Sequence, residues 1–311
     1  MNGKILIVGS LNTDIVVKVK QMPVLGETIL GEGLQYVMGG KGANQACAVG
    51  RLGGTGYMLG CVGEDKFGAI QMESLNRSGV DVSRMKTVER ETGTAVILVD
   101  GKGNNSIVVS QGANKNCDVH YLKQNEDMFR LCDIILLQLE IPYEAIFYAV
   151  RKAKEYEKTV ILNPAPAPEA GEIPDEIYQM IDYITPNETE LLRLSGTEDS
   201  SVEGLERGAE VLLEKGVKKV IVTMGDNGAL LVSQEGKQIF AALTVAAVDT
   251  TAAGDCFNGA FAVAIAAGMN DELAIRYANA AASIAVSRVG AQNSIPVKAE
   301  VDQLLQTGRG N

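Results

Sequence analysis

The segment from Val248 to Ala260 holds the residues best suited to chemistry on a phosphate group. Ala252, Ala253 and Gly254 are small and open a predicted helix, whose first N–H groups are free and whose N-terminus carries a partial positive charge. Such a helix start favours phosphate binding. Asp255 follows in the first turn, where it could accept a proton or only stabilise the helix start. The helix dipole should lower its pKa.

A second glycine-rich segment, residues 39–46 (GGKGANQA), also precedes a predicted helix. Its glycines allow close approach to the backbone, and Asn44 offers both a donor and an acceptor. The segment is not a Walker A loop, because no Ser or Thr follows Lys41 and the first glycine is missing at the required spacing. A simple glycine-rich helix start remains the alternative interpretation.

Polar residues follow two apolar, strand-like runs. Asn12 and Asp14 come after residues 4–8, and Glu140 comes after residues 134–137. Ligands of α/β proteins bind at the carboxyl ends of parallel strands. Asn12 and Asp14 could therefore hold sugar hydroxyls, although an ordinary polar turn would look the same.

Two further turns could serve a phosphate ligand. Asn187 can cap a helix that begins with two acidic residues, and Glu190 could order the water around a metal ion. Residues 223–228 (TMGDNG) end a strand in a tight glycine turn, which could also be only a hairpin.

The elements that must position these residues alternate between strand and helix. Strand-like runs occur at residues 4–8, 57–61, 134–137, 159–162, 183–185 and 220–223. Helix-like runs occur at residues 42–52, 67–77, 143–157 and 202–215, and almost continuously from residue 254, with a break at 268–271. This alternation predicts an α/β fold with a doubly wound, mostly parallel sheet and helices on both faces.

Two regions break the alternation. Residues 14–20 and 27–38 are strand-like around a Pro/Gly turn, and residues 94–100 and 106–110 resemble a hairpin. We expect a small β-sheet lid from about 14–38 and 94–110, inserted in a single domain of residues 1–311.

Composition excludes several classes of protein. The chain has 311 residues, 46% of them hydrophobic, and a formal net charge of −11. An acidic chain without a block of Lys or Arg is not expected to bind nucleic acid. No apolar run approaches the roughly 18 residues that span a bilayer. The N-terminus does not resemble a signal peptide, so we expect no membrane partner and a cytoplasmic location.

Histidine and cysteine usage narrows the chemistry. The single histidine, His120, lies in a polar stretch and is expected at the surface. The five cysteines form no C-x-x-C pair, which argues against a disulfide framework or a zinc site. A general base in this chain should therefore be a carboxylate.

Taken together and in this order, the motifs resemble the PfkB carbohydrate-kinase family over nearly the whole chain. The strongest matches are residues 39–46 and 249–259, supported by 163–167, 185–190 and 288–292. The resemblance implies transfer of the γ-phosphoryl group of ATP to the 5-hydroxyl of D-ribose, giving D-ribose 5-phosphate. Asp255 would be the general base, and the backbone of 252–254 the anion hole.

The resemblance also implies the remaining site residues. The sugar would be held by Asn12, Asp14, Gly40, Lys41, Gly42, Ala43, Asn44, Glu140 and Asp255. ATP would contact Asn187, Thr223, Gly225, Asp226, Gly228, Gly254 and Asn279, although Asp226 and Asn279 depart from the residues common in relatives. Mg²⁺ would accompany ATP, with Glu190 acting through water.

Two further properties are implied by the resemblance. K⁺ would bind beside the anion hole at Asp249, Thr251, Ala285, Arg288, Gly290 and Ser294. The lids of two subunits would pair in a homodimer.

Three other functions are alternatives to this one. A related sugar or nucleoside kinase, acting on deoxyribose or another pentose, shares the same motifs. A non-catalytic sugar-binding protein would not need Asp255 beside a phosphate site. A nicotinamide-dependent dehydrogenase would carry G-x-G-x-x-G after its first strand, whereas Gly9 is followed here by Ser-Leu-Asn.

Overall fold

Eight strands form the main sheet in the computed structural model, which describes residues 3–307. The sheet order is β14-β13-β12-β11-β10-β9-β1-β4. The strands are β1 (Lys4–Val8), β4 (Thr55–Leu59), β9 (Ile134–Leu137), β10 (Thr159–Leu162), β11 (Tyr183–Ile184), β12 (Lys219–Thr223), β13 (Ala229–Ser233) and β14 (Gly236–Phe240). All neighbours from β4 to β12 pair in parallel, and β13 and β14 are antiparallel. The prediction of a mostly parallel sheet is confirmed.

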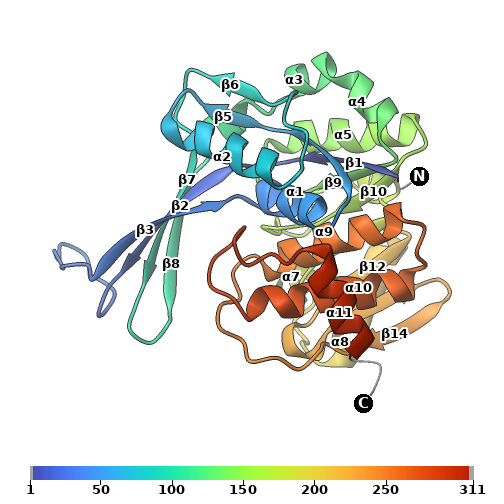
Figure 1. Cartoon of the computed structure of the whole chain (residues 1–311). Coiled ribbons are helices and arrows are strands. Elements are labelled where there is room, and N and C mark those ends of the chain that lie inside the picture. Colours follow the sequence, from blue (N-terminus) through green and yellow to red (C-terminus); the bar gives the residue numbers. More distant parts are fainter. Residues whose placement is uncertain (1–2, 308–311) are drawn as a thin grey trace.

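Helices cover both faces of this sheet (Figure 1). One face packs against α1 (Lys41–Arg51), α2 (Lys66–Arg77), α9 (Ala253–Ala266), α10 (Asp271–Val286) and α11 (Lys298–Thr307). The other packs against α3 (Val119–Gln124), α4 (Glu126–Leu131), α5 (Tyr143–Glu155), α6 (Asp175–Tyr178), α7 (Glu188–Ser195) and α8 (Val202–Glu214). Alternate residues of the buried strand β1 point to the two cores: Ile5 and Ile7 to one, Leu6 and Val8 to the other.

A second sheet of four strands, the lid, projects from one side of this body (Figure 1). Its order is β3-β2-β7-β8, formed by β2 (Asn12–Lys18), β3 (Gly33–Gly39), β7 (Gly93–Val99) and β8 (Asn105–Ser110). The separate β-sheet is thus confirmed. The prediction that β3 starts near residue 27 is wrong, because β2 ends at Lys18, whose partner is Gly33. Residues 27–32 therefore lie outside the strand, and only the N–H of Glu32 among them still donates to the end of β2 in the described structure, to the Lys18 carbonyl at 2.7 Å.

Two further details differ from the sequence-based expectation. A short parallel pair, β5 (Cys61–Gly63) with β6 (Lys86–Val88), was not predicted. The C-terminal helical third contains a second break, residues 287–297, between α10 and α11. The chain turns there at Gly290, whose φ of 97° is unfavourable for other residues.

Met1 and Asn2, on which the expectation about a leader partly rested, lie outside the described residues. Among residues 3–307 no helix combines the length and the apolar character that a bilayer crossing requires. His120 is exposed on α3, as predicted.

Candidate active site

The predicted sugar-binding residues meet at the carboxyl ends of β1 and β9, where the order of the sheet reverses. The chain passes from β1 to β4 on one side and then returns to β9 on the other. Ser10 follows β1 and donates to Oε2 of Glu140, which follows β9, at 2.5 Å. The backbone N–H of Lys41 donates to the same oxygen at 3.1 Å. Glu140 is thereby joined to the start of α1.

Glycines allow the lid and α1 to meet at this point. Gly40 is the N-cap of α1 with a φ of 88°, and a Cβ there would lie 2.5 Å from the backbone nitrogen of Asn12. A Cβ on Gly39 would lie 2.3 Å from Oδ2 of Asp14. The glycines therefore allow close approach within the protein's own chain, and their predicted approach to a ligand stays a prediction.

The next two residues of the glycine-rich segment support the site from behind. The N–H of Gly42 donates to Oγ of Ser10 at 3.4 Å, and the N–H of Ala43 donates to the Ser10 carbonyl at 2.9 Å. Both residues are buried. Their backbone donors therefore hold α1 against β1.

The predicted anion hole lies at the start of α9. Ala252 is the N-cap, adopts the left-handed conformation with a φ of 59°, and makes no side-chain hydrogen bond to the helix. The helix starts at Ala253, and Gly254 is exposed while Asp255 is buried. The N–H of Ala253 donates to the Thr250 carbonyl at 3.2 Å, whereas the N–H groups of Ala252 and Gly254 make no hydrogen bond within the described residues. An accessible helix start without a capping side chain can offer such N–H groups to a phosphoryl group.

Asp255 is held by two amide side chains of α1. Asn44 Nδ2 donates to Oδ2 at 2.9 Å, and Gln45 Nε2 donates to Oδ1 at 3.0 Å. Burial raises the pKa of Asp255, and the Lys41 charge and the two amide donors only partly oppose this. The expectation that the helix dipole lowers this pKa is therefore wrong, because desolvation of the carboxylate is the larger effect.

Charged residues from the lid and the body form one cluster with Asp255. Burial raises the pKa of Asp14 to about 7, with further contributions from Glu140 and Asp255. Burial alone would lower the pKa of Lys41, but the surrounding carboxylates, Asp255 first, outweigh it and raise that pKa. Lys41 therefore remains a cation among acids.

The candidate nucleotide residues lie at the next strand ends. Asn187 pairs with Thr223 in an isolated parallel bridge. Asn187 also caps α7: Glu190 N donates to Asn187 Oδ1 at 2.8 Å, and Asn187 N donates to Glu190 Oε2 at 2.9 Å. This confirms the capping interpretation. Burial raises the pKa of Glu190, and both Lys41 and Asp255 also act on it.

The turn after β12 is a hairpin connection. Residues Gly225–Asn227 form a 3₁₀ turn that leads into the antiparallel strand β13, and Met224 N donates to Gly228 O at 2.7 Å. Asp226 is exposed. Asn279 on α10 is buried and donates to the Phe240 carbonyl at 3.0 Å. Its side-chain donor therefore binds the end of β14.

Asp249 joins two of the other predicted K⁺ residues, Thr251 and Gly290. Its carboxylate accepts the N–H of Thr251 at 2.9 Å and the N–H of Gly290 at 2.9 Å. Partial burial opposes ionisation of Asp249, but these hydrogen bonds outweigh it and lower its pKa. The loop before α9 is thus tied to the loop after α10.

The remaining residues predicted to bind K⁺ make contacts within the protein. Ala285 O accepts the N–H of Arg288 at 3.1 Å, and the Arg288 side chain pairs with Glu300 at 2.6 Å. Ser294 is fully buried, and its hydroxyl donates to Ala291 O at 2.8 Å. Within residues 3–307 no group of three or more His, Cys, Asp or Glu residues is placed to hold a metal.

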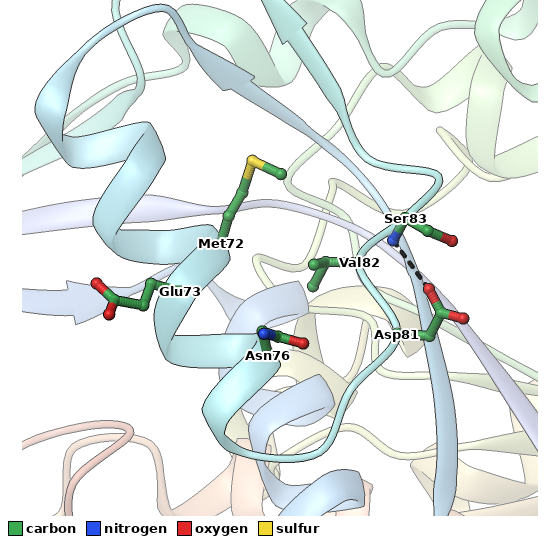
Figure 2. A pocket seen from close by; sticks show the side chains of 6 residues that line it. All are labelled: Met72, Glu73, Asn76, Asp81, Val82 and Ser83. Carbon is green, nitrogen blue, oxygen red and sulfur yellow. Dashed lines mark hydrogen bonds between the residues drawn. The ribbon is translucent and has the colours of Figure 1, made fainter.

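Figure 2 shows a hollow away from these residues, between α2 and residues 81–83. It is lined by Met72, Glu73, Asn76, Asp81, Val82 and Ser83. None of the predicted site residues lines it, so it is separate from the candidate active site.

Sequence reasoning missed several buried polar residues behind Asp255. They are Gln45, Gln138, Asn163, Thr185 and Asn258, all less than a tenth exposed. A signal was available, because Gln138, Asn163 and Thr185 each directly follow a strand of the parallel sheet. Polar residues at such strand ends lie where ligands of α/β proteins bind, as Asn12 and Glu140 do.

Comparison with known proteins agrees with this geometry. The profile described as pfkB family carbohydrate kinase matches residues 2–298. The chain belongs to the pfkB family of carbohydrate kinases. This carbohydrate kinase is 39% identical over 308 residues to a ribokinase of Haemophilus influenzae, covering 98% of this chain and 99% of the relative. It is 42% identical over 311 residues to a ribokinase of Schizosaccharomyces pombe, covering 96% of each.

Solved structures have the same fold. The crystal structure of a Thermotoga maritima ribokinase matches this kinase with a TM-score of 0.87 at 40% identity, covering 98% of this chain and 100% of the other. The Arabidopsis thaliana ribokinase, solved with ribose and ATP, matches with a TM-score of 0.90 at 35% identity, covering 98% and 99%. The predicted family and the doubly wound α/β fold with its separate β-sheet are confirmed.

Proposed function

We propose that this carbohydrate kinase transfers the γ-phosphoryl group of ATP to the 5-hydroxyl of D-ribose, giving D-ribose 5-phosphate and ADP. The observation that carries the proposal is the position of Asp255, a buried carboxylate in the first turn of a helix without a capping side chain. Relatives named ribokinase at 39–42% identity over nearly their whole length, and the Arabidopsis ribokinase with ribose and ATP, support the choice of substrates.

The sugar site combines acceptors from the lid and the body. Asn44 Oδ1 is buried and has no hydrogen-bond partner within the described residues, while its Nδ2 is used by Asp255. A buried acceptor without a partner is costly, and a sugar hydroxyl would satisfy it. Asn12, Asp14, Lys41 and Glu140 supply the other polar groups, over the backbone of Gly40, Gly42 and Ala43.

Asp255 acts as the general base in this proposal. It accepts the proton of the 5-hydroxyl as that oxygen bonds to the γ-phosphorus and the bond from phosphorus to the leaving oxygen of ADP breaks. Phosphoryl transfer depends mainly on positioning and charge stabilisation. In this proposal the N–H groups of Ala252, Ala253 and Gly254 face the charge on the transferring oxygens, and that of Ala253 first leaves the Thr250 carbonyl, to which it donates at 3.2 Å.

The nucleotide site lies beside this helix start. Asn187, Thr223, Gly225, Asp226, Gly228, Gly254 and Asn279 contact ATP in this proposal. Glu190 Oε1 takes no part in the capping box and is available to water. That donor set suits Mg²⁺, which keeps several waters and binds through few carboxylates. When bound, Mg²⁺ neutralises charge on the phosphates.

We also propose a K⁺ site behind the anion hole. The oxygen ligands in this proposal are the Asp249 carboxylate, the Ser294 hydroxyl and the carbonyls of Thr251, Ala285, Arg288 and Gly290. One carboxylate among neutral oxygens suits a large monovalent cation better than a transition metal. A bound K⁺ supplies a fixed positive charge, while Asp249 holds the two loops together through Thr251 and Gly290.

The lid supports the proposal of a homodimer. Its edge strand β8 carries Ile107, Val108 and Val109 in succession, and these side chains are 52%, 69% and 50% exposed. An exposed apolar edge strand is normally covered. Because ATP is the donor, we further propose a cytoplasmic location, which cell fractionation tests.

Coupled measurement of ADP release with a panel of sugars and nucleosides tests the main proposal. D-ribose should give the highest kcat/KM. A deoxyribokinase of Salmonella typhi is 33% identical over 302 residues, covering 97% of this chain and 98% of the relative, so 2-deoxyribose is the essential competitor. A clearly higher kcat/KM for 2-deoxyribose, another pentose or a nucleoside would replace ribose while leaving the kinase assignment in place.

A further inference from the structure

A ring of hydrogen bonds connects the Asp255 carboxylate to the backbone carbonyl of Gly254, both in the first turn of α9. From Asp255 it runs through Gln45, Asn163, Thr185 and Asn258. Gln45 Nε2 donates both to Asp255 Oδ1 at 3.0 Å and to Asn163 Oδ1 at 3.1 Å. Asn163 Nδ2 donates to the Thr185 carbonyl at 3.0 Å.

The ring closes on the residue before Asp255. The Thr185 hydroxyl donates to Asn258 Oδ1 at 2.6 Å, and Asn258 Nδ2 donates to the Gly254 carbonyl at 2.8 Å. Gly254 and Asp255 share a peptide bond, so the ring joins the carboxylate to the anion-hole backbone. Every side chain in it is buried.

Two backbone carbonyls determine the direction of each bond in the ring. A carbonyl only accepts, so Asn163 must turn its NH₂ group to Thr185 O and its oxygen to Gln45. Gln45 must then present its NH₂ group to Asn163, which places the second hydrogen of that group on Asp255. Gln138 Nε2 donates to Gln45 Oε1 at 2.6 Å and supports the same orientation. The donor on Asp255 is therefore determined by geometry and not by the choice between two amide orientations.

We propose that Gln45 is the positioning residue that keeps Asp255 oriented and ionised, with Asn163 and Gln138 fixing Gln45 in turn. The inference rests on the proposed role of Asp255 as general base. Gln45 itself touches neither substrate in this proposal, because its two donors and its acceptor are all used inside the protein.

Other groups around Asp255 cannot replace this donor. Lys41 stabilises the carboxylate by its charge, whereas Glu140, Asp14 and Glu190 destabilise it. Cys256, next in the chain, is a buried thiol whose own pKa is raised by burial. Asn44 donates to the opposite oxygen, Oδ2. Among residues 3–307 only Gln45 donates to Oδ1, so its loss leaves that oxygen buried without a donor and raises the pKa of Asp255 further.

The test compares Gln45→Met with the matched variant Gln71→Met. Gln71 is also buried, but it donates to the Asn12 and Gly39 carbonyls and does not touch Asp255. For Gln45→Met at saturating ribose and ATP, we expect the acid limb of the kcat–pH profile to move upward by about one to two pH units, the effect of losing one hydrogen bond to a charged group. Gln71→Met should lower the melting temperature while the limb stays in place.

Asn163→Leu provides a second, milder test. Gln45 can still reach Asp255 in this variant, but it loses the acceptor that orients it, so the limb should move less than in Gln45→Met. If Gln45→Met does not fold, Asn163→Leu decides the question. An acid limb that stays within about 0.3 pH units of wild type in the folded variants overturns the proposal.

A direct titration separates this inference from the proposed function. ¹³C NMR of aspartate-labelled protein reports the Asp255 carboxyl, identified by its loss in Asp255→Asn. The Asp255 pKa should be higher in Gln45→Met whether or not ribose is phosphorylated. An unchanged Asp255 pKa refutes the role of Gln45. A wild-type protein without ribose-dependent ADP release refutes the proposed substrate, and full turnover in Asp255→Asn refutes the base.

Discussion

Asp255 and Asp14 are two carboxylates of the same site that the protein treats in opposite ways. Burial is the main cause of a raised pKa in both. Asp255, in the body, receives two side-chain donors at 2.9 and 3.0 Å. Asp14, on the first lid strand, lies against Gly39 and receives no side-chain hydrogen bond from the described part of the chain. In the proposed mechanism the body therefore orients the base before substrate arrives, whereas the lid leaves an acceptor for the substrate to satisfy.

The largest effect is expected from removing the carboxylate of Asp255, in the body. Asp255→Asn preserves size but cannot take a proton, so kcat should fall by roughly 10²–10⁴ while the KM values for ribose and ATP change far less. Kinetics and melting temperature are measured on the same preparation. If Asp255 only supported the helix start, the variant would melt earlier and turn over almost normally; a kcat within a few-fold of wild type would show this.

The next largest effect is the pH dependence of the KM for ribose, which tests Asp14 on the lid. Burial raises the pKa of Asp14 to about 7, so Asp14 is largely protonated at pH 6 and largely ionised at pH 8. The ionised form can accept two hydroxyl donors, so the KM for ribose should fall by about tenfold as pH rises through this range. Steady-state kinetics at several pH values measure it. In Asp14→Asn the KM should be high and independent of pH; if its pH dependence matched wild type, another group would be responsible.

A smaller effect concerns the loops behind the anion hole. We expect kcat to rise several-fold when K⁺ replaces Na⁺ or a bulky organic cation at constant ionic strength, because the cation fixes the backbone of residues 252–254. In Asp249→Asn this dependence on K⁺ should weaken. Equal rates in all three salts would argue against the proposed K⁺ site.

The smallest expected effect on catalysis concerns the outer part of the lid. Val108 and Val109 are similarly exposed and point to opposite faces of β8. If one lid face pairs with a second subunit, Lys at one of these positions should give monomers, and Lys at the other should leave the dimer intact. Light scattering at micromolar concentration measures the mass. A monomeric wild type would contradict the homodimer, and two dimeric variants would contradict pairing through β8.

Local patterns predicted much of this molecule because they depend on neighbours in the chain. Asn187 and Glu190 are three residues apart, and they form the predicted cap. The helix expected at 202–215 spans Val202–Glu214. The strand ends that carry Asn12 and Glu140 could be located in the same way, since an apolar run that ends in polar residues is visible in the sequence.

Predictions from the sequence were wrong where a segment distant in the chain decided the local structure or the pKa. Residues 27–32 have a strand-like composition but form no strand in the described structure, because the pairing of β2 ends at Lys18 with Gly33. The pKa of Asp255 was expected to be low from its place in a helix, yet burial by other elements outweighs the dipole. Helix composition alone did not predict the break at 287–297.

The sequence by itself determined the family and the α/β class, and it predicted which residues act on a phosphoryl group, because these are encoded in short motifs and in periodicity. Only the tertiary structure decided how those residues are held. Gln45 donates to Asp255, which is 210 residues away in the chain, and to Asn163, which is 118 residues away. Which residues become partners depends on the order of strands in the sheet. The direction of each hydrogen bond depends on the carbonyls of Thr185 and Gly254, whose positions no local pattern predicts.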